Sequence, residues 1–240
     1  MSEPIKATIG FISGGAGSMP HYSSFLPLIP DSVKVEFVGL ELYSESLYQI
    51  ADKKQTIVDR LEEWIAQRHW DGVILTAAPT EVLNPGLFEA LKERLAVPFT
   101  TALHACVTGL RVFSVKRVLL LTPFDERLNR LIREHLGKRG FDAVAPHPFE
   151  DLAVPKRMDP DEVFELAKKS LRATDPVDAI YFQGAVLDPI KVLEKIERDL
   201  GMMVIASNPA MLWYVLSKLG LSYPMSGYGR LMREWPAIIA

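Results

Sequence analysis

The chain alternates short β-branched apolar runs with amphipathic stretches, and this order restricts its fold more than any other feature. The first apolar run, residues 7–13, leads directly into Gly14-Gly15-Ala16-Gly17, as a buried strand leads into a tight loop. Between residues 45 and 67 the apolar side chains recur at helical spacing, with charges on the opposite face. Strands that alternate with helices in this way predict parallel sheets built from β-α-β units.

The same order of elements occurs twice along the chain. The first half predicts strands at 7–13, 33–38, 71–77 and 97–101, and helices at 45–67, 85–95 and 103–112. The second half predicts strands at 117–122, 140–144, 178–182 and 203–207, and helices at 125–138, 159–173, 188–200 and 210–219. A weak internal repeat supports this division, since residues 70–78 align with residues 177–185 at the same strand of each half. We therefore expect an α/β protein of two similar lobes, each with a four-stranded parallel sheet.

The two sets of elements also suggest where the lobes begin and end. We expect a first lobe at residues 1–112 and a second at 113–221, with the tail at 222–240 packing back on the first lobe. Parallel α/β sheets bind ligands beyond the carboxyl ends of their strands. If the lobes face one another, the loops at these ends line a single cleft.

Composition excludes several other classes of protein. A net charge of −3 provides no basic face for nucleic acid, and no apolar run is long enough to span a membrane. The first residues lack the basic and then apolar layout of a signal peptide, so we expect a cytoplasmic protein, with homo-oligomerisation left open. The single cysteine, Cys106, excludes a disulfide within the chain and a zinc site built from cysteines.

Candidate binding residues follow the predicted strands. The glycine-rich loop has N–H groups that could hold a carboxylate or a phosphate, although a plain turn fits it equally well. Thr80 could bond a substrate carboxylate or simply cap a helix, and Tyr48 could donate its phenol to an anion or pack beneath a loop.

Candidate proton-transfer groups are fewer. His21 and His104 lie just past predicted strand ends, and Glu81 and Asp188 are carboxylates in similar positions, although acids there also favour helix N-termini. Cys106 lies in a predicted helix, where a buried free cysteine is usually inert packing.

Several segments, in order along nearly the whole chain, resemble one known group of enzymes. The more specific ones are Ser207-Asn208-Pro209-Ala210 with Trp213 and Gly227-Tyr228-Gly229-Arg230-Leu231; weaker ones are Ile9-Gly10, Thr100-Thr101, Gly109-Leu110-Arg111 and residues 117–124 with Asn129. The chain thus resembles the arylmalonate decarboxylase and maleate cis-trans isomerase group of the Asp/Glu/hydantoin racemase superfamily. The resemblance implies two Rossmann-like lobes related by a pseudo-twofold axis. It also implies a small acid bound between them, and chemistry by cysteine thiols without a metal or an organic cofactor.

This chain departs from the pattern of that group. The positions of the two family cysteines fall on Ala78 and Gly184, and Cys106 aligns with neither. Phe124 stands where many relatives have a tyrosine, while Gly14 and Gly15 stand where the decarboxylase has paired prolines. Tyr48 and Thr80, in contrast, lie at or next to positions that hold the substrate carboxylate in the family.

The combination predicts a cofactor-independent lyase or isomerase, decarboxylase-like, that acts on a small carboxylic or dicarboxylic acid. An enediolate-type intermediate would form without the family's thiols. Tyr48, Thr80 and backbone amides around Ala78-Pro79 and Gly184-Ala185 would hold the acid, and His21 is the leading candidate for proton transfer. Two alternatives remain: a non-catalytic small-carboxylate-binding protein on this scaffold, or a hydratase with a non-cysteine acid or base.

The inert role expected of Cys106 can be tested by mutation. The Cys106→Ala variant should keep its activity and lose about 1 kcal/mol or less in free energy of unfolding, because the volume change is small. Activity assays and denaturant unfolding would measure both. A complete loss of activity in a folded variant would show that the thiol takes part in the reaction.

Overall fold

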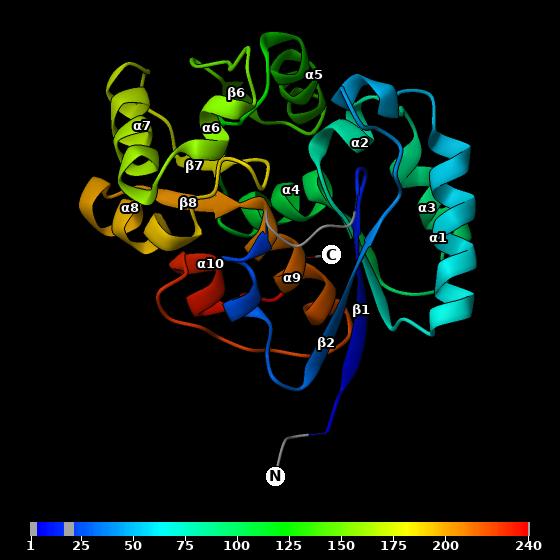
Figure 1. Ribbon diagram of the computed structural model, residues 1–240. Coiled ribbons are helices and arrows are strands. Elements are labelled where there is room, and N and C mark those ends of the chain that lie inside the picture. Colours follow the sequence, from blue (N-terminus) through cyan, green and yellow to red (C-terminus); the bar gives the residue numbers. More distant parts are fainter. Residues whose placement is uncertain (1–3, 17–21, 240) are drawn as a thin grey trace.

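The structure is a computed structural model that describes residues 4–16 and 22–239. Its strands form two four-stranded parallel sheets, with strand orders β2-β1-β3-β4 and β6-β5-β7-β8 (Figure 1). Each order places the first strand of its half between the second and the third. The prediction of an α/β fold with two similar four-stranded parallel sheets is therefore confirmed.

The first sheet is covered on its outer face by helices that follow its own strands. Its strands are β1 (Ala7–Ser13), β2 (Val33–Gly39), β3 (Gly72–Leu75) and β4 (Phe99–Thr101). The helices are α1 (Lys54–Arg68) and α3 (Leu87–Arg94), with the short helices η2 (Leu26–Leu28), η3 (Leu47–Ile50) and α2 (Ala78–Val82) in the connections. Ile12 and Val73 of the sheet share a hydrophobic cluster with Leu61 of α1 and Leu91 of α3.

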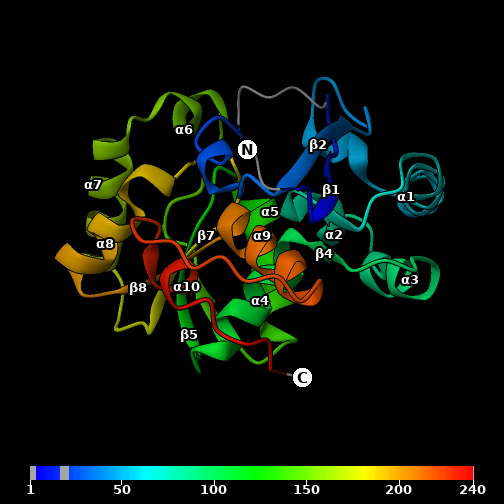
Figure 2. The same ribbon diagram turned by 90° about the horizontal axis from the view of Figure 1, so that it is seen from below.

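The second sheet repeats this arrangement. Its strands are β5 (Arg117–Leu121), β6 (Asp142–Val144), β7 (Ala179–Phe182) and β8 (Met203–Ala206). Its helices are α5 (Glu126–Gly137), α6 (Ala153–Arg157), α7 (Pro160–Arg172), η4 (Ile190–Val192) and α8 (Leu193–Leu200). Leu119 and Ile180 of the sheet share an outer cluster with Val163 of α7 and Ile196 of α8. Figure 2 shows α1 and α3 at one side of the molecule and α7 and α8 at the other.

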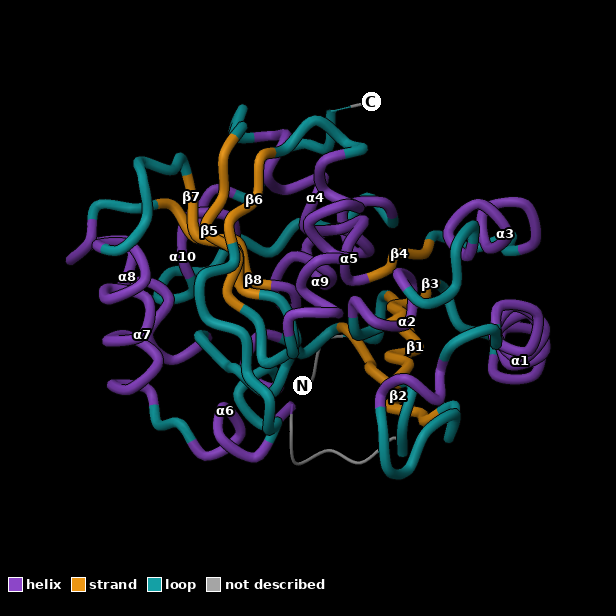
Figure 3. The backbone as a smooth tube through the Cα atoms, turned by 90° about the horizontal axis from the view of Figure 1, so that it is seen from above, coloured by secondary structure: helices purple, strands orange, loops and turns teal. Residues whose placement is uncertain are grey.

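Two helices form a central layer between the sheets. Helix α4 (Ala102–Val112) follows β4 but also packs on β8, and α9 (Ser207–Lys218) follows β8 but also packs on β3 and β4. The two helices pack against each other, and Figure 3 shows them between the two groups of strands. The largest hydrophobic cluster includes Ile74 of the first sheet, Ile205 of the second and the fully buried Trp213 of α9. Each half of the chain thus completes the core of the other.

The internal repeat has a structural counterpart. Asp71, just before β3, accepts a hydrogen bond from the N–H of Thr8 at 2.7 Å. Asp178, just before β7, accepts from the N–H groups of Lys116 and Arg117, each at 2.8 Å. These aspartates occupy equivalent positions in the aligned segments. Each joins the third strand of its half to the start of the first.

The predicted helix at 45–67 is wrong in its first part. Residues 47–50 form a separate 3-10 turn, because Ser46 and Gln49 make a capping box that closes it. Asp52 then adopts a left-handed conformation with φ 58°, which ends any continuous helix, and α1 begins at Lys54. Helices α2, α6 and α10 (Gly229–Glu234) were not predicted, because each is too short to show a helical period.

The C-terminal tail contacts both halves of the chain. The Tyr223 hydroxyl lies 2.8 Å from the Ser32 hydroxyl beside the first sheet, while α10 packs on β8 and α8 of the second half. Our proposed boundary between residues 112 and 113 falls where α4 ends. Among the described residues, no helix has both the length and the apolar character needed to cross a membrane.

The packing of the central layer makes opposite predictions for two glycines. A Cβ on Gly72 of β3 would lie 2.7 Å from Val215 Cγ1, and the valine side chain of α9 is stiff in a helix. A Cβ on Gly109 of α4 would make an ordinary contact with Ile205 at 3.4 Å. We expect Gly72→Ala to lower the free energy of unfolding by about 1–3 kcal/mol through overpacking. Gly109→Ala should raise it by up to about 1 kcal/mol through helix propensity.

Urea unfolding of both variants would measure these changes. Equal effects at the two positions would show that the sheets and the central helices are packed less closely than described.

Candidate functional site

The inner face of each sheet is the face toward α4 and α9. At the carboxyl ends of the strands, this face carries buried polar side chains. Because side chains alternate along a strand, the residue two positions after a central-core residue points to the same side. These pairs are Phe11 and Ser13, Ile74 and Thr76, Leu120 and Thr122, and Tyr181 and Gln183. The second member of each pair stands at the carboxyl end of a parallel strand, where ligands bind in this class of fold.

The loops beyond these strand ends meet across the two halves. The Tyr48 hydroxyl donates to the Asp125 carboxylate, with O–O distances of 2.7 and 2.8 Å. The hydroxyl of Ser24 donates to Asp188, and α2 of the first half packs on α5 of the second. The carboxyl ends of both sheets therefore face a common region between the lobes.

The predicted residues Gly14, Gly15 and Thr80 come together at the end of β1. A Cβ on Gly14 would lie 2.6 Å from Ile50 Cδ1 and 3.4 Å from Thr80 Oγ1, and a Cβ on Gly15 would lie 2.9 Å from the Tyr43 ring. The loop can approach these neighbours closely only because it lacks side chains. The Thr80 hydroxyl is buried and donates to the Thr76 carbonyl at 3.1 Å, so only its lone pairs are free.

Tyr48 and Phe124 line one pocket of about 350 Å³. Asp125, Phe149 and Leu152 also line it. The Tyr48 phenol would have to leave Asp125 to bind an acid, and burial together with that hydrogen bond raises the pKa of Tyr48 to about 12. The pocket thus has an aromatic wall and a donor that is currently held by a carboxylate.

The predicted residues after β3 and β7 adopt related conformations. Ala77 and Gly184, which are equivalent in the internal repeat, both have positive φ, 67° and 107°. Ala78 and Pro79 then begin the buried helix α2, whereas Gly184 and Ala185 line a space of about 10 Å³, the size of one water molecule. The Gly184 N–H points to the Ser207 hydroxyl at 3.3 Å.

The histidine and aspartate candidates for proton transfer differ in where they lie and what they contact. His21, the predicted proton-transfer residue, lies outside the described residues. His104 stacks on Phe88 and lies 3.0 Å from the Tyr214 hydroxyl, and burial lowers its pKa to about 4. Asp188 accepts hydrogen bonds from the Ser24 hydroxyl and from the Ile190 N–H.

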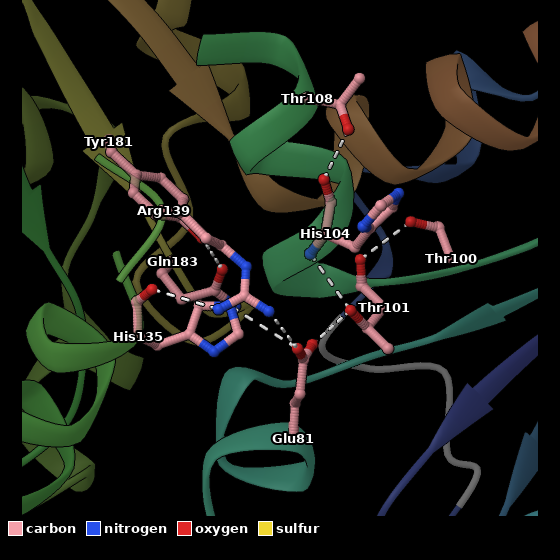
Figure 4. Close-up of polar contacts among 9 residues, drawn as sticks. All are labelled: Glu81, Thr100, Thr101, His104, Thr108, His135, Arg139, Tyr181 and Gln183. Atoms are coloured by element: carbon pink, nitrogen blue, oxygen red, sulfur yellow. Dashed lines mark hydrogen bonds and ion pairs between the residues drawn. The ribbon is translucent and has the colours of Figure 1, made fainter. Parts of the chain in front are cut away.

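A buried acid lies where the two halves meet (Figure 4). Glu81 of α2 is 7% exposed and accepts a hydrogen bond from the Thr101 hydroxyl at the end of β4. Its Oε1 lies 3.6 Å from His135 Nε2 and 3.8 Å from an Arg139 nitrogen, both at or near the end of α5. Tyr181 and Gln183 of the second sheet lie in the same cluster.

Burial dominates the protonation of this cluster. It raises the pKa of Glu81 to about 7, although the Thr101 hydroxyl and the Arg139 charge act in the opposite direction. Burial and the same arginine lower the pKa of His135 to about 3, so that its imidazole is neutral at physiological pH. Near pH 7, Glu81 is therefore a group that can either give or take a proton.

The only thiol of the chain is buried in the core, next to the Tyr181 hydroxyl. Cys106 is fully buried in α4, and burial raises its pKa to about 12. A thiol that remains protonated inside the core is a poor nucleophile. The expectation that Cys106 is a buried helix residue is confirmed.

Comparison with known proteins decides the family. The model of the arylmalonate decarboxylase family matches residues 72–232. The chain belongs to the arylmalonate decarboxylase family. Arylmalonate decarboxylase from Bordetella bronchiseptica is 27% identical over 245 residues, covering 98% of this chain and all of that protein. Maleate isomerase from Nocardia farcinica is 30% identical over 161 residues, covering 63% of this chain and 62% of that protein.

Solved structures show the same fold. A crystal structure of arylmalonate decarboxylase superimposes with a TM-score of 0.79 at 23% identity, covering 95% of this chain and 99% of the other. Nocardia farcinica maleate cis-trans isomerase gives a TM-score of 0.75 at 21% identity, covering 95% and 98%. These structures confirm the expected fold, and the match of the family model confirms the family expected from the sequence motifs.

The sequence pointed only weakly to some residues of the region between the lobes. Asp125 is identifiable as a helix N-cap, and the structure confirms this through its bond to the Leu128 N–H at 2.9 Å. No residue near Asp125 in the sequence indicates its hydrogen bond with Tyr48. Gln183 follows a predicted strand, which was the one available sign of its position, whereas His135 and Arg139 read as ordinary residues at a helix end.

Metal binding has no support in the described part of the chain. No group of three or more His, Cys, Asp or Glu side chains there is arranged to hold an ion.

The buried acid predicts a pH-dependent stability. The ordinary pKa of a glutamate is 4.5, and that of Glu81 in the folded protein is about 7. Between these values the folded state binds more protons than the unfolded state, so the free energy of unfolding falls as pH rises. Glu81→Gln removes this loss, and its stability relative to the wild type should rise by up to about 3 kcal/mol between pH 4 and pH 8.

Denaturant unfolding at several pH values would measure the difference, with Glu93→Gln, an exposed glutamate of α3, as the matched control. A difference for Glu81→Gln that stays constant over this range would contradict the raised pKa.

Proposed function

We propose that this chain is a decarboxylase-like lyase or isomerase that acts on a small carboxylic or dicarboxylic acid without a catalytic thiol or a cofactor. Its family membership supports the broad reaction class, because the relatives are named arylmalonate decarboxylase and maleate isomerase. The observation that carries the finer proposal is the set of strand ends between the lobes. They bear buried hydrogen-bonding groups, while the only thiol lies inside α4.

The backbone at Gly184 strengthens the argument against a thiol. A Cβ at this position would lie 2.9 Å from Pro123 Cδ, and φ 107° is strained for any residue with a side chain. Gly184 therefore has no room for a cysteine in this conformation. The region suits hydrogen bonding to an acid, not attack on it.

The proposed decarboxylation needs no thiol in its first step. The bond from the central carbon to one carboxylate breaks, carbon dioxide leaves, and the electron pair passes into the remaining carboxylate as an enediolate. Hydrogen-bond donors near that oxygen stabilise its growing negative charge, as an oxyanion hole does. Backbone amides around Ala78 and Gly184 are the donors we propose to hold the acid. Tyr48 joins them once its hydroxyl leaves Asp125, and Thr80 once its hydroxyl turns away from the Thr76 carbonyl.

The second step adds a proton to the carbon. His21 is our candidate from the sequence, and Glu81 is the described acid that supports this step best, because its pKa is about 7. Asp188 is less suitable, since Ser24 and the Ile190 N–H already bond to it. We propose that one of the first two groups replaces the thiol as proton donor.

Incubation with malonate, phenylmalonate and maleate tests this function. We expect turnover of at least one acid, detected by NMR of the products, and a loss of about 100-fold or more in kcat when the proton donor is replaced. Parallel assays of His21→Ala and Glu81→Gln would identify that donor. Glu93→Gln is again the matched control.

The same panel separates the alternatives. Thermal stabilisation by an acid without any product would favour the carboxylate-binding protein, whereas addition of water to maleate would favour the hydratase. If none of the acids is bound or converted, the proposal is contradicted.

A further inference from the structure

Gln183 is a buried polar side chain that has a hydrogen-bond partner at one end of its amide and none at the other. It follows β7 on the inner face of the sheet, directly before Gly184, and only 1% of it is exposed. The Tyr181 hydroxyl donates to its side-chain oxygen at 2.5 Å. Its side-chain nitrogen, Nε2, has no hydrogen-bond partner among the described residues.

The bond from Tyr181 fixes how the amide is oriented. Tyr181 is itself fully buried, and burial, followed by the neighbouring Cys106 thiol, raises the pKa of its phenol well above 10. The hydroxyl therefore keeps its proton, which it donates to the Gln183 oxygen. The oxygen of Gln183 is therefore held on the tyrosine side. The two N–H bonds of Nε2 consequently point away from Tyr181.

A buried amide nitrogen without an acceptor is uncommon in folded proteins, because water is lost and nothing replaces it. Folding alone would favour an apolar side chain at this position. Such a group is explained if its acceptor arrives with a ligand.

The surroundings favour an acceptor with negative charge. Figure 4 places Gln183 in the same cluster as Arg139, whose guanidinium carries a fixed positive charge, and Glu81, whose pKa of about 7 leaves it partly protonated at neutral pH. The third titratable neighbour, His135, is neutral at that pH. A carboxylate oxygen is the acceptor that matches an amide donor next to an arginine.

We propose that Gln183 Nε2 donates a hydrogen bond to an oxygen of the bound acid and stabilises the negative charge that develops there. This inference rests on the proposed function and adds a catalytic residue to it. The amide cannot release a proton, so it acts only as a fixed donor. Tyr181 is a positioning residue, because it holds the amide in place.

Two variants and one control test this role. Gln183→Leu removes the donor, and the double variant Tyr181→Phe/Gln183→Leu removes the pair with nearly the same shape. Gln67→Leu, on the exposed face of α1, is the matched control. The readouts are kcat and KM on the acid that the wild type converts, malonate binding by calorimetry, and the unfolding temperature.

We expect kcat of Gln183→Leu to fall about 100-fold, as for the loss of an oxyanion donor, with a smaller change in KM. The double variant should lose activity equally and unfold at or above the wild-type temperature, because both polar partners are replaced together. Lost activity with unchanged or higher stability would show that Gln183 donates to the substrate and is not required for folding.

Three outcomes would count against parts of this scheme. Wild-type kcat in a folded Gln183→Leu would overturn the inference while the proposed function stands. A double variant that fails to fold, or unfolds well below the wild type, would also overturn it, since the amide would then have a structural partner. Failure of the wild type to bind or convert any acid would instead disprove the proposed function.

Discussion

The packing of α4 against α9 between the two sheets is the interaction on which the rest of the structure depends. Each helix continues one sheet and covers the other, so neither half can bury its inner face alone. Gly72 allows close contact between β3 and Val215 of α9, whereas Gly109 of α4 leaves room for a Cβ beside Ile205. Because burial of apolar area is the main favourable term in folding, the shared layer fixes the two lobes in one arrangement.

That arrangement brings polar strand ends into a region from which water is largely excluded. Burial there raises the pKa of Glu81 to about 7 and lowers the pKa of His135 to about 3, in each case disfavouring the charged form. The same effect raises the pKa of Cys106 to about 12. One physical cause thus produces a carboxyl that can exchange protons near neutral pH, a neutral histidine and an unreactive thiol. Of these three groups, the Glu81 carboxyl is the one suited to proton transfer in reactions of acids.

Much of the fold was predictable because its signals are local. The strand runs and the helices expected from residues 125 and 159 depend on residues within a few positions, and the structure contains them, with Asp125 and Asp159 as their N-caps. The helix expected at 45–67 was wrong in its first part, because the left-handed turn at Asp52 leaves no mark on hydrophobic periodicity. The short helix α2 was missed for a similar reason. It determines where Thr80 and Glu81 lie, so its absence from the prediction limited what could be said of the site.

The sequence by itself determined two similar α/β halves, the family motifs and the presence of a single cysteine. Only the tertiary structure decided that Tyr48 donates to Asp125, 77 positions away, and that Glu81 lies against His135 and Arg139. It also decided that Gln183 is buried with one end held by Tyr181 and the other without a partner. Local patterns report the conformation of a segment, whereas burial and charge depend on which distant segments meet. In this protein that meeting is set by two helices, each packed on the sheet of the other half.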